Sequence, residues 1–380
     1  MNEKISALYS EYVIDGIARE LTPARILSAC LADPVSEADK GGYDPVVDES
    51  LDPALKPCVT DPSLISEYAA SVKSLPGRIF PVAFPETYTK ARIASALIDA
   101  IWREGHFRLD DLSLRLGWSW NPRRIGDMTA FYSSVYSAAD YADSLGLKLS
   151  GYSYGDSAGE SLLSAEASLG SVKPADEEDD FFDELPFRTE HPQMGDRMLH
   201  PSTLVPDPQS WLIYIPFENC EYRLGASLLA QVLGVSGAVA PQILDADYFI
   251  DCYEVVRELV EDGIVLSGVT VGDGGLMAAL NGMAADGTGA SVDLSGLAAA
   301  THEPDIVRLL FSEVPGVVIQ IADIDYDYVD AELLLQDVAF YPLGHPVPGK
   351  TGVEVLASAR TGIQTILESL IRSQSSEGED

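Results

Sequence analysis

The spacing of apolar positions is most regular between residues 211 and 321. Residues 211–215 form a short apolar run that is long enough for one buried strand. Residues 228–234 and 277–283 have the composition of helices, and each follows a turn that contains glycine. Residues 309–321 end the region with another apolar run. The repeated order of strand, glycine turn and helix predicts an α/β domain with a mixed sheet.

A second patterned block runs from residue 76 to about residue 155. Residues 88–102 form a strongly amphipathic stretch with Ile93, Leu97 and Ile101 on one stripe, which predicts a helix. Residues 128–145 predict another helix, and Gly146 is a natural stop at its C-terminus. The block is therefore predicted to be a small α+β domain.

The first 75 residues are predicted to be a helical extension followed by a connector. Apolar residues recur at three- and four-residue steps in the first part, which predicts helix within 2–32. Thr22-Pro23 fits the start of a second helix, because proline is well tolerated at the first helical position. Residues 33–62 are rich in Asp and Pro and predict an exposed connector.

Residues 174–186 contain six acids within eight residues, and such a segment repels itself and cannot form a core. A mobile linker is predicted, with a metal-binding acidic loop as the alternative. The tail 373–380 is expected to be disordered. The chain then divides into an extension and connector (1–75), a reduced α+β domain (76–172), an acidic linker (173–205), a mixed-sheet α/β domain (206–372) and a tail (373–380).

The charge of the chain is strongly negative, with 60 acidic and 24 basic side chains and a formal net charge of −36. Nucleic acids and anionic membranes are disfavoured as partners because both need a basic face. The four cysteines are scattered without metal-ligand spacing, so neither a zinc site nor a disulfide framework is predicted. No signal peptide is evident, and no apolar run approaches the roughly 20 residues that span a bilayer. A cytoplasmic protein is expected.

Three motifs in the C-terminal region carry a resemblance to a known family. They are Leu224-Gly-Ala-Ser-x-Leu-Ala-Gln231, Asp273-Gly-Gly-Leu276 and Leu310-Phe-Ser-Glu-x-x-Gly-Val-Val-Ile-Gln320. In this order they resemble the last ligase domain of phosphoribosylformylglycinamidine synthase, of the aminoimidazole-ribonucleotide-synthase-like superfamily. Residues 76–172 resemble a reduced form of the synthase's N-terminal-type domain.

The resemblance implies a place in purine biosynthesis. It implies part of an ATP-dependent C–N ligase that converts formylglycinamide ribonucleotide to its amidine, with ATP and Mg as cofactors. It also implies a homodimer, or a complex with a chain that bears the glycine-rich ATP-binding half. No glutaminase is predicted here, because no cysteine lies in a Gly-Cys-x-Gly turn.

The sequence departs from the family pattern at positions that carry chemistry. Residues 269–272 read Val-Thr-Val-Gly where the family places a histidine before Asp-Gly-Gly, so a titratable group is lost. Ser119 replaces an asparagine before tryptophan, and the loop 151–154 lacks the family's lysine. Three hypotheses follow: a partner-dependent part of the synthase, a non-catalytic paralogue that binds a nucleotide or forms an oligomer, or another ATP-using member of the superfamily. No catalytic residue is assigned.

The turn formed by Asp273, Gly274 and Gly275 is the first candidate binding feature. Glycine lets the backbone approach a ligand closely, and the N-terminus of the following helix presents free N–H groups to an anion. The resemblance implies a phosphate or ribose phosphate there. The alternative is that the two glycines only permit a tight turn from strand to helix.

Arg223, Gly225 and Ser227 form a second candidate feature at the entry to a helix, where a guanidinium beside backbone donors suits a phosphate. Arg223 could instead pair with a surface acid. Glu313 matches the family's Phe-x-Glu and would bind a ribose hydroxyl or cap local backbone. No metal site is predicted: Asp323-x-Asp325-x-Asp327 lacks the glycine and glutamate of a calcium loop, and Asp245 fits a helix cap.

Overall fold

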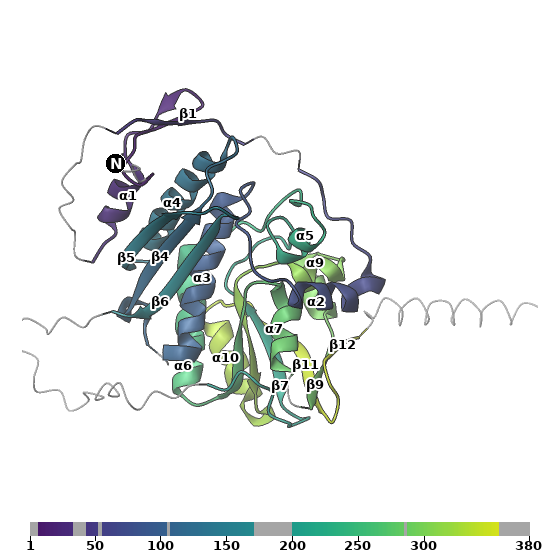
Figure 1. The fold of residues 1–380 in the computed structure, drawn as a ribbon. Helices are drawn as coiled ribbons and strands as arrows, with labels where there is room; N and C mark the ends of the chain where they lie inside the picture. The colour runs from purple at the N-terminus through teal and green to yellow at the C-terminus, as the bar shows by residue number, and fades with distance from the viewer. Residues whose placement is uncertain are drawn as a thin grey trace, which may run out of the picture.

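The computed structural model describes residues 7–32, 43–51, 55–104, 107–170, 200–284 and 287–356. The described residues form three sheets, and helices pack between and around the two larger ones (Figure 1). Residues 173–199 of the predicted acidic linker and the predicted tail lie outside the described residues, whereas residues 200–205 are described and Leu204 is buried.

The largest sheet is formed by the C-terminal region and has six strands in the order β12-β9-β11-β7-β10-β8. Their bounds are β7 (Trp211–Pro216), β8 (Val265–Val271), β9 (Thr288–Val292), β10 (Gly316–Ile321), β11 (Tyr341–Pro348) and β12 (Val353–Val355). All neighbours are antiparallel except β12 and β9, which are parallel, so the predicted mixed sheet and α/β fold class are confirmed.

The six-stranded sheet separates two hydrophobic cores. Along β7, Ile213 and Ile215 point into one core and Leu212 and Tyr214 into the other, as expected where successive side chains alternate. Helices therefore cover both faces. The C-terminal helices are α5 (Leu228–Val232), α6 (Ala246–Glu261), α7 (Gly275–Met283), α8 (Ser295–Thr301), α9 (Ile306–Phe311) and α10 (Tyr326–Leu335), with the 3₁₀ turn η3 (Asp323–Asp325) before α10.

The second sheet has the order β5-β4-β6, with β4 (Leu112–Trp120) parallel to β5 (Lys148–Asp156) and antiparallel to β6 (Leu162–Leu169). The 3₁₀ turn η2 (Leu109–Asp111) precedes β4. The two predicted helices are confirmed as α3 (Pro85–Glu104) and α4 (Asp127–Ser144), and Gly146 follows with φ 70°.

Helix α3 joins the two larger sheets, since it packs on both β6 and β8. Its side chain Trp102 lies so close to Gly268 of β8 that a Cβ at residue 268 would come within 2.5 Å of the indole ring. Glycine at this position therefore allows α3 to pack closely against the C-terminal sheet. This contact is one of those that join the two larger sheets.

The prediction of helix throughout residues 2–32 is wrong. Residues 12–18 form a hairpin of β1 (Tyr12–Ile14) and β2 (Ile17–Ala18), and among the described residues 7–32 only the part after Thr22 is helical, as α1 (Pro23–Ala29). Asp15 and Gly16 both have positive φ, of 54° and 77°, which suits the tight turn that Asp-Gly favours. The start of α1 is confirmed, because the Thr22 side chain caps it and Pro23 is its first residue.

The predicted connector is also more structured than expected. Strand β3 (Val46–Asp48) pairs parallel with β1, and the Asp48 carboxylate accepts backbone N–H groups of Gly126, Met128 and Thr129 at 2.9–3.0 Å. This carboxylate therefore caps α4 from a distant part of the chain. Further along, η1 (Pro62–Leu64) leads into α2 (Ile65–Lys73), which packs on α5 and α7. Within the described ranges, no helix is both long and apolar enough to cross a membrane.

Candidate functional site

The turn between β8 and α7 contains the first predicted feature. Gly274 and Gly275 have φ values of 83° and 67°, a region that residues with a Cβ rarely adopt. A Cβ at Gly275 would also lie 2.7 Å from the Ser312 carbonyl oxygen and 2.8 Å from that of Leu310. The second glycine is thus required for packing against the end of α9, whatever else the turn does.

Glu313 lies immediately beside this turn, just after α9. Its Oε1 accepts the backbone N–H of Gly274 at 2.8 Å and that of Leu228, the first residue of α5, at 2.7 Å. One carboxylate thus occupies the positive N-terminal ends of α5 and α7 together. Of the two uses considered for Glu313, the structure has it in contact with backbone; binding of a ribose hydroxyl stays a prediction.

Ser227 caps α5 beside Glu313, because its Oγ accepts the N–H of Ala230 at 3.1 Å. Its neighbour Ala226 has φ 61°, which is uncommon for a residue with a Cβ. The first turn of α5 and the turn before α7 are therefore held together through Glu313, and Ser227, Gly274 and Glu313 form one cluster with Asp273.

Arg78 is the central side chain that the sequence did not reveal. Its guanidinium pairs with the Glu313 carboxylate at 2.7 Å, lies 3.7 Å from Asp273 through Nε, and donates to the Ala226 carbonyl oxygen. The side chain is 9% exposed and lies over the ring of Tyr88 at 5.0 Å. Arg78 stands in a Pro-Gly-Arg stretch before α3 with no periodic pattern, so its only signal was the scarcity of basic residues.

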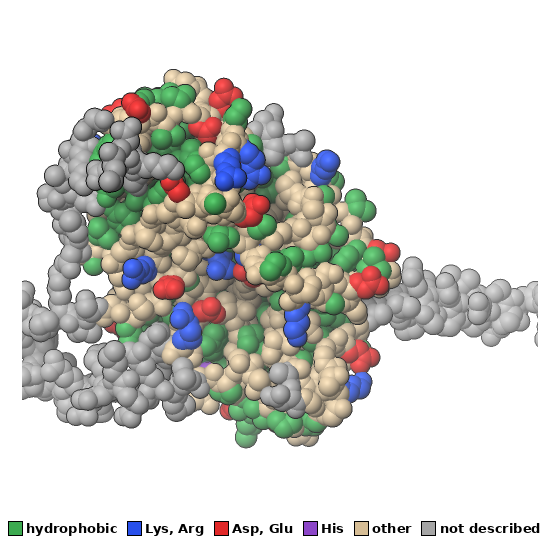
Figure 2. Space-filling model, in the orientation of Figure 1, with side chains coloured by type: hydrophobic (Ala, Val, Ile, Leu, Met, Phe, Trp, Pro, Cys, Tyr) green, Lys and Arg blue, Asp and Glu red, His purple; other side chains and the backbone are tan. Residues whose placement is uncertain are grey.

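Arg92 on α3 adds a second cation. Its Nη1 donates to the Asp273 Oδ2 at 2.8 Å, and the side chain is 28% exposed. The Nε atoms of Arg78 and Arg92 are both buried without a hydrogen-bond acceptor in the described part of the chain. Figure 2 shows Lys and Arg side chains lying across the middle of this face of the molecule. Two guanidinium groups with unused N–H donors therefore converge on Asp273, an arrangement that suits an anionic ligand.

Burial and ion pairing have opposite effects on the pKa of Glu313. Burial raises the pKa of Glu313 to about 7, while Arg78 and the backbone N–H groups of Gly274 and Leu228 act in the opposite direction. The carboxylate meets only donors, so above pH 7 it is ionised and paired with Arg78.

Arg223 points elsewhere. Its Nε donates to Glu221 at 3.0 Å, while its backbone N–H donates to the Ser312 Oγ at 3.1 Å. The pairing with a surface acid is thus what the structure has for this side chain, and its role as a phosphate clamp stays a prediction. Gly225 has a packing role, since its N–H donates to the Val239 carbonyl oxygen at 2.7 Å and its Cα lies against Gly237.

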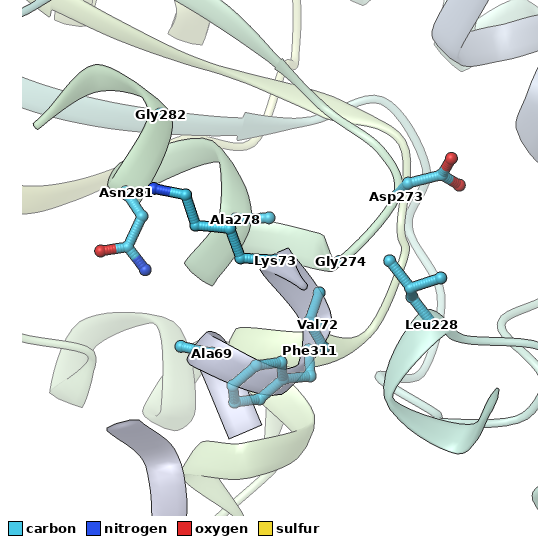
Figure 3. Close-up of a pocket in the computed structure, with 10 residues that line it drawn as sticks. All are labelled: Ala69, Val72, Lys73, Leu228, Asp273, Gly274, Ala278, Asn281, Gly282 and Phe311. Atoms are coloured by element: carbon cyan, nitrogen blue, oxygen red, sulfur yellow. The ribbon is translucent and has the colours of Figure 1, made fainter. Parts of the chain in front are cut away.

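A hollow of about 220 Å³ opens beside Asp273 and Gly274, with α2 as one of its walls (Figure 3). It is smaller than the roughly 300–1,000 Å³ of sites that enclose a whole drug-sized ligand, so it has room for only part of a ligand of that size. Within the described ranges, no group of three or more His, Cys, Asp or Glu side chains could hold a metal ion. Asp273 is the exposed carboxylate beside the arginines, and it alone does not define a metal site.

Comparison with known proteins gives the class of this fold. Residues 224–353 match the family described as AIR synthase related protein, C-terminal domain. The matched residues run from the entry to α5 to the first residue of β12, so they hold the turn before α7 and Glu313. This part of the chain is therefore similar to that family, at the residues that carry the sequence motifs.

Particular relatives carry the name of the synthase. The chain is 24% identical over 264 residues to the probable chloroplastic/mitochondrial phosphoribosylformylglycinamidine synthase of Arabidopsis thaliana, a match that covers 69% of this chain and 17% of the relative. Two structures of Thermotoga maritima PurL, complexed with ATP and with FGAR, are 15% and 16% identical. They give TM-scores of 0.50 and 0.51 over 73% of this chain and 40% and 42% of theirs. The predicted resemblance is confirmed, and the chain spans less than half the length of these relatives.

Proposed function

We propose that this chain binds the phosphate groups of a nucleotide at the contact between α3 and the turn before α7. The observation that carries the proposal is the convergence of Arg78 and Arg92 on Asp273, with two buried Nε donors lacking an acceptor in the described residues. Arg92 is the more exposed of the two and would meet the ligand first. The likeness to proteins named as synthase, and to PurL complexed with ATP and with FGAR, supports a ligand of this class.

We further propose that the chain serves purine biosynthesis as one part of a phosphoribosylformylglycinamidine synthase-type assembly. In this role its own residues bind and orient the nucleotide, and a partner chain or second copy supplies the glycine-rich half and the ammonia. ATP drives formation of the C–N bond in such a ligase. Magnesium would be held mainly by ligand phosphate oxygens, with Asp273 as the carboxylate that this chain offers.

A specific observation favours the second candidate, a nucleotide-binding module without chemistry. Glu313 already occupies the N–H donors of Leu228 and Gly274 at the N-terminal ends of α5 and α7. Residues 269–272 read Val-Thr-Val-Gly where the family places its histidine. The two candidates share the binding site and differ in turnover. Mixing the chain with its glycine-rich partner and assaying amidine formation separates them.

Isothermal calorimetry with ATP, ADP and formylglycinamide ribonucleotide, at pH 8 with magnesium, tests the binding site. We expect micromolar binding of at least one of the three, and at least about a tenfold loss with Arg92→Ala because a charged hydrogen-bond donor to phosphate is removed. Lys350→Ala, which removes an exposed cation paired only with Glu354 among the described residues, should leave the affinity unchanged. Absence of heat with all three ligands would contradict the proposal.

A further inference from the structure

The hollow beside Asp273 is completed by α2, which precedes the residues matched by the family. Ala69 and Val72 of α2 face Ala278 of α7, and Phe311 and Leu228 complete the apolar lining (Figure 3). Helix α2 is held in place by its own packing, because Val72 is 7% exposed and Tyr68 meets Phe311 edge to face at 6.1 Å. The hollow is therefore a formed feature of the fold, with apolar sides suited to the faces of a flat ring.

The two ends of the hollow are polar and differ in chemistry. Lys73 and Asn281 lie at one end, and Asp273 lies at the other (Figure 3). Neither the Lys73 ammonium nor the Asn281 amide has a hydrogen bond or ion pair within the described residues. An amide offers a donor and an acceptor side by side, which is the pattern that pairs with the edge of adenine.

The hollow is continuous with the arginine cluster through one residue. Asp273 lines the hollow and also contacts Arg92 at 2.8 Å and Arg78 at 3.7 Å. A ligand with a ring in the hollow would thus place its adjoining groups beside the Asp273 carboxylate, which accepts hydrogen bonds from hydroxyls. Its anionic end would then reach the two guanidinium groups.

We propose that the hollow between α2 and α7 is the base subsite of this chain and takes the adenine ring of a nucleotide, with the Asn281 amide bonding the ring edge. The proposal rests on the proposed nucleotide binding and assigns a role to α2, a segment outside the family match. Lys73 closes the end of the hollow, where its aliphatic stem covers the ring and its ammonium stays in water.

The test compares two probes, ATP and inorganic tripolyphosphate, by calorimetry at pH 8 with the full chain. Wild-type protein should bind ATP at least about tenfold more tightly than tripolyphosphate, because only ATP fills the hollow. Asn281→Leu, which keeps the shape and removes the amide, should lower ATP affinity by about tenfold and leave tripolyphosphate affinity unchanged. Lys73→Met should weaken ATP by a smaller factor, and Lys350→Met is the matched control.

Ala278→Leu tests the same subsite by a different change. It fills the hollow with apolar volume and keeps a good helix former on α7. It should weaken ATP and spare tripolyphosphate, with an unchanged far-ultraviolet circular dichroism spectrum. Equal affinities of wild type for the two probes would overturn the base subsite and leave the phosphate site standing. So would ATP binding that Asn281→Leu and Ala278→Leu do not change. Failure of both probes to bind wild type would overturn the proposed function as well.

Discussion

At pH 8, replacing Arg78 by Met should lower the free energy of unfolding by about 3 to 5 kcal/mol, the cost of leaving a buried charge without its partner. The side chains of Arg78 and Glu313 are 9% and 11% exposed, and the pair joins residues 235 positions apart in the sequence. Methionine keeps the apolar stem of Arg78 and removes only its charge and donors. Urea unfolding, followed by circular dichroism, measures the change.

Two further variants show whether the buried charge is the cause. Arg78→Met/Glu313→Gln should be more stable than Arg78→Met alone, since glutamine keeps an acceptor for the N–H groups of Gly274 and Leu228 without a charge. Arg257→Met is the matched control: Arg257 is 5% exposed, but its partners Glu254, Glu258 and Glu261 are 32–55% exposed and return to water. Equal costs for the two single Arg variants would contradict a special role for Glu313.

The pH dependence of the Arg78→Met cost has a definite sign. Because burial raises the pKa of Glu313 to about 7, the folded protein holds this proton more tightly than the unfolded chain does. The contribution of Glu313 to stability is therefore fully present below its unfolded pKa and is lost as the pH rises through the folded value. Without Arg78 that folded pKa rises further, so the Arg78→Met penalty should shrink between pH 8 and pH 5.

Gly225→Ala should produce the second large effect, a loss of about 3 kcal/mol in the free energy of unfolding. A Cβ at this position would overlap the Val239 carbonyl group and lie 2.6 Å from the Ala240 nitrogen, and these are backbone atoms that cannot rotate away. The loop entering α5 would have to open, which moves Ser227 and the Leu228 N–H away from Glu313. The same urea unfolding measures the loss.

Gly296→Ala is the matched control for this substitution. Gly296 lies in α8 with open space where its Cβ would be, so alanine should stabilise the protein by about 0.5 to 1 kcal/mol. If Gly225→Ala were as stable as the wild type, the close approach of residues 225 and 239 would not be required by the fold.

The sequence predicted those elements whose signals are local. The strand at 211–215, the glycine turn before α7, the helices α3 and α4 and the Asp245 cap of α6 each depend on a few adjacent residues. The Asp15-Gly16 turn was also a local signal, but the three- and four-residue spacing around it outweighed it and led to the wrong helix. The spacing of apolar residues over so short a stretch cannot distinguish one turn of helix from a hairpin. Either structure could bury Tyr12, which is buried here in the hairpin.

The site was harder to predict, because its side chains meet through the fold. Asp273, Gly274 and Glu313 could be chosen from motifs, whereas Arg78 and Arg92 reach them only because α3 packs on β8. Conversely, Arg223 was chosen because it precedes a motif, but in the structure its side chain pairs with Glu221. Because basic residues are scarce in this chain, an arginine was expected to take part in the site. Only the tertiary structure shows which arginines do.

Amide hydrogen exchange with and without magnesium ATP, at pH 8, tests the central claim most directly, since it locates a bound ligand along the backbone. The account predicts slower exchange on ATP addition at the start of α5, at the start of α7 and on α3 around Arg92. Exchange in α10, which packs on the face of the sheet away from α5 and α7, should be unchanged. Unchanged exchange throughout, or protection confined to α10 and other segments away from Asp273, would contradict it.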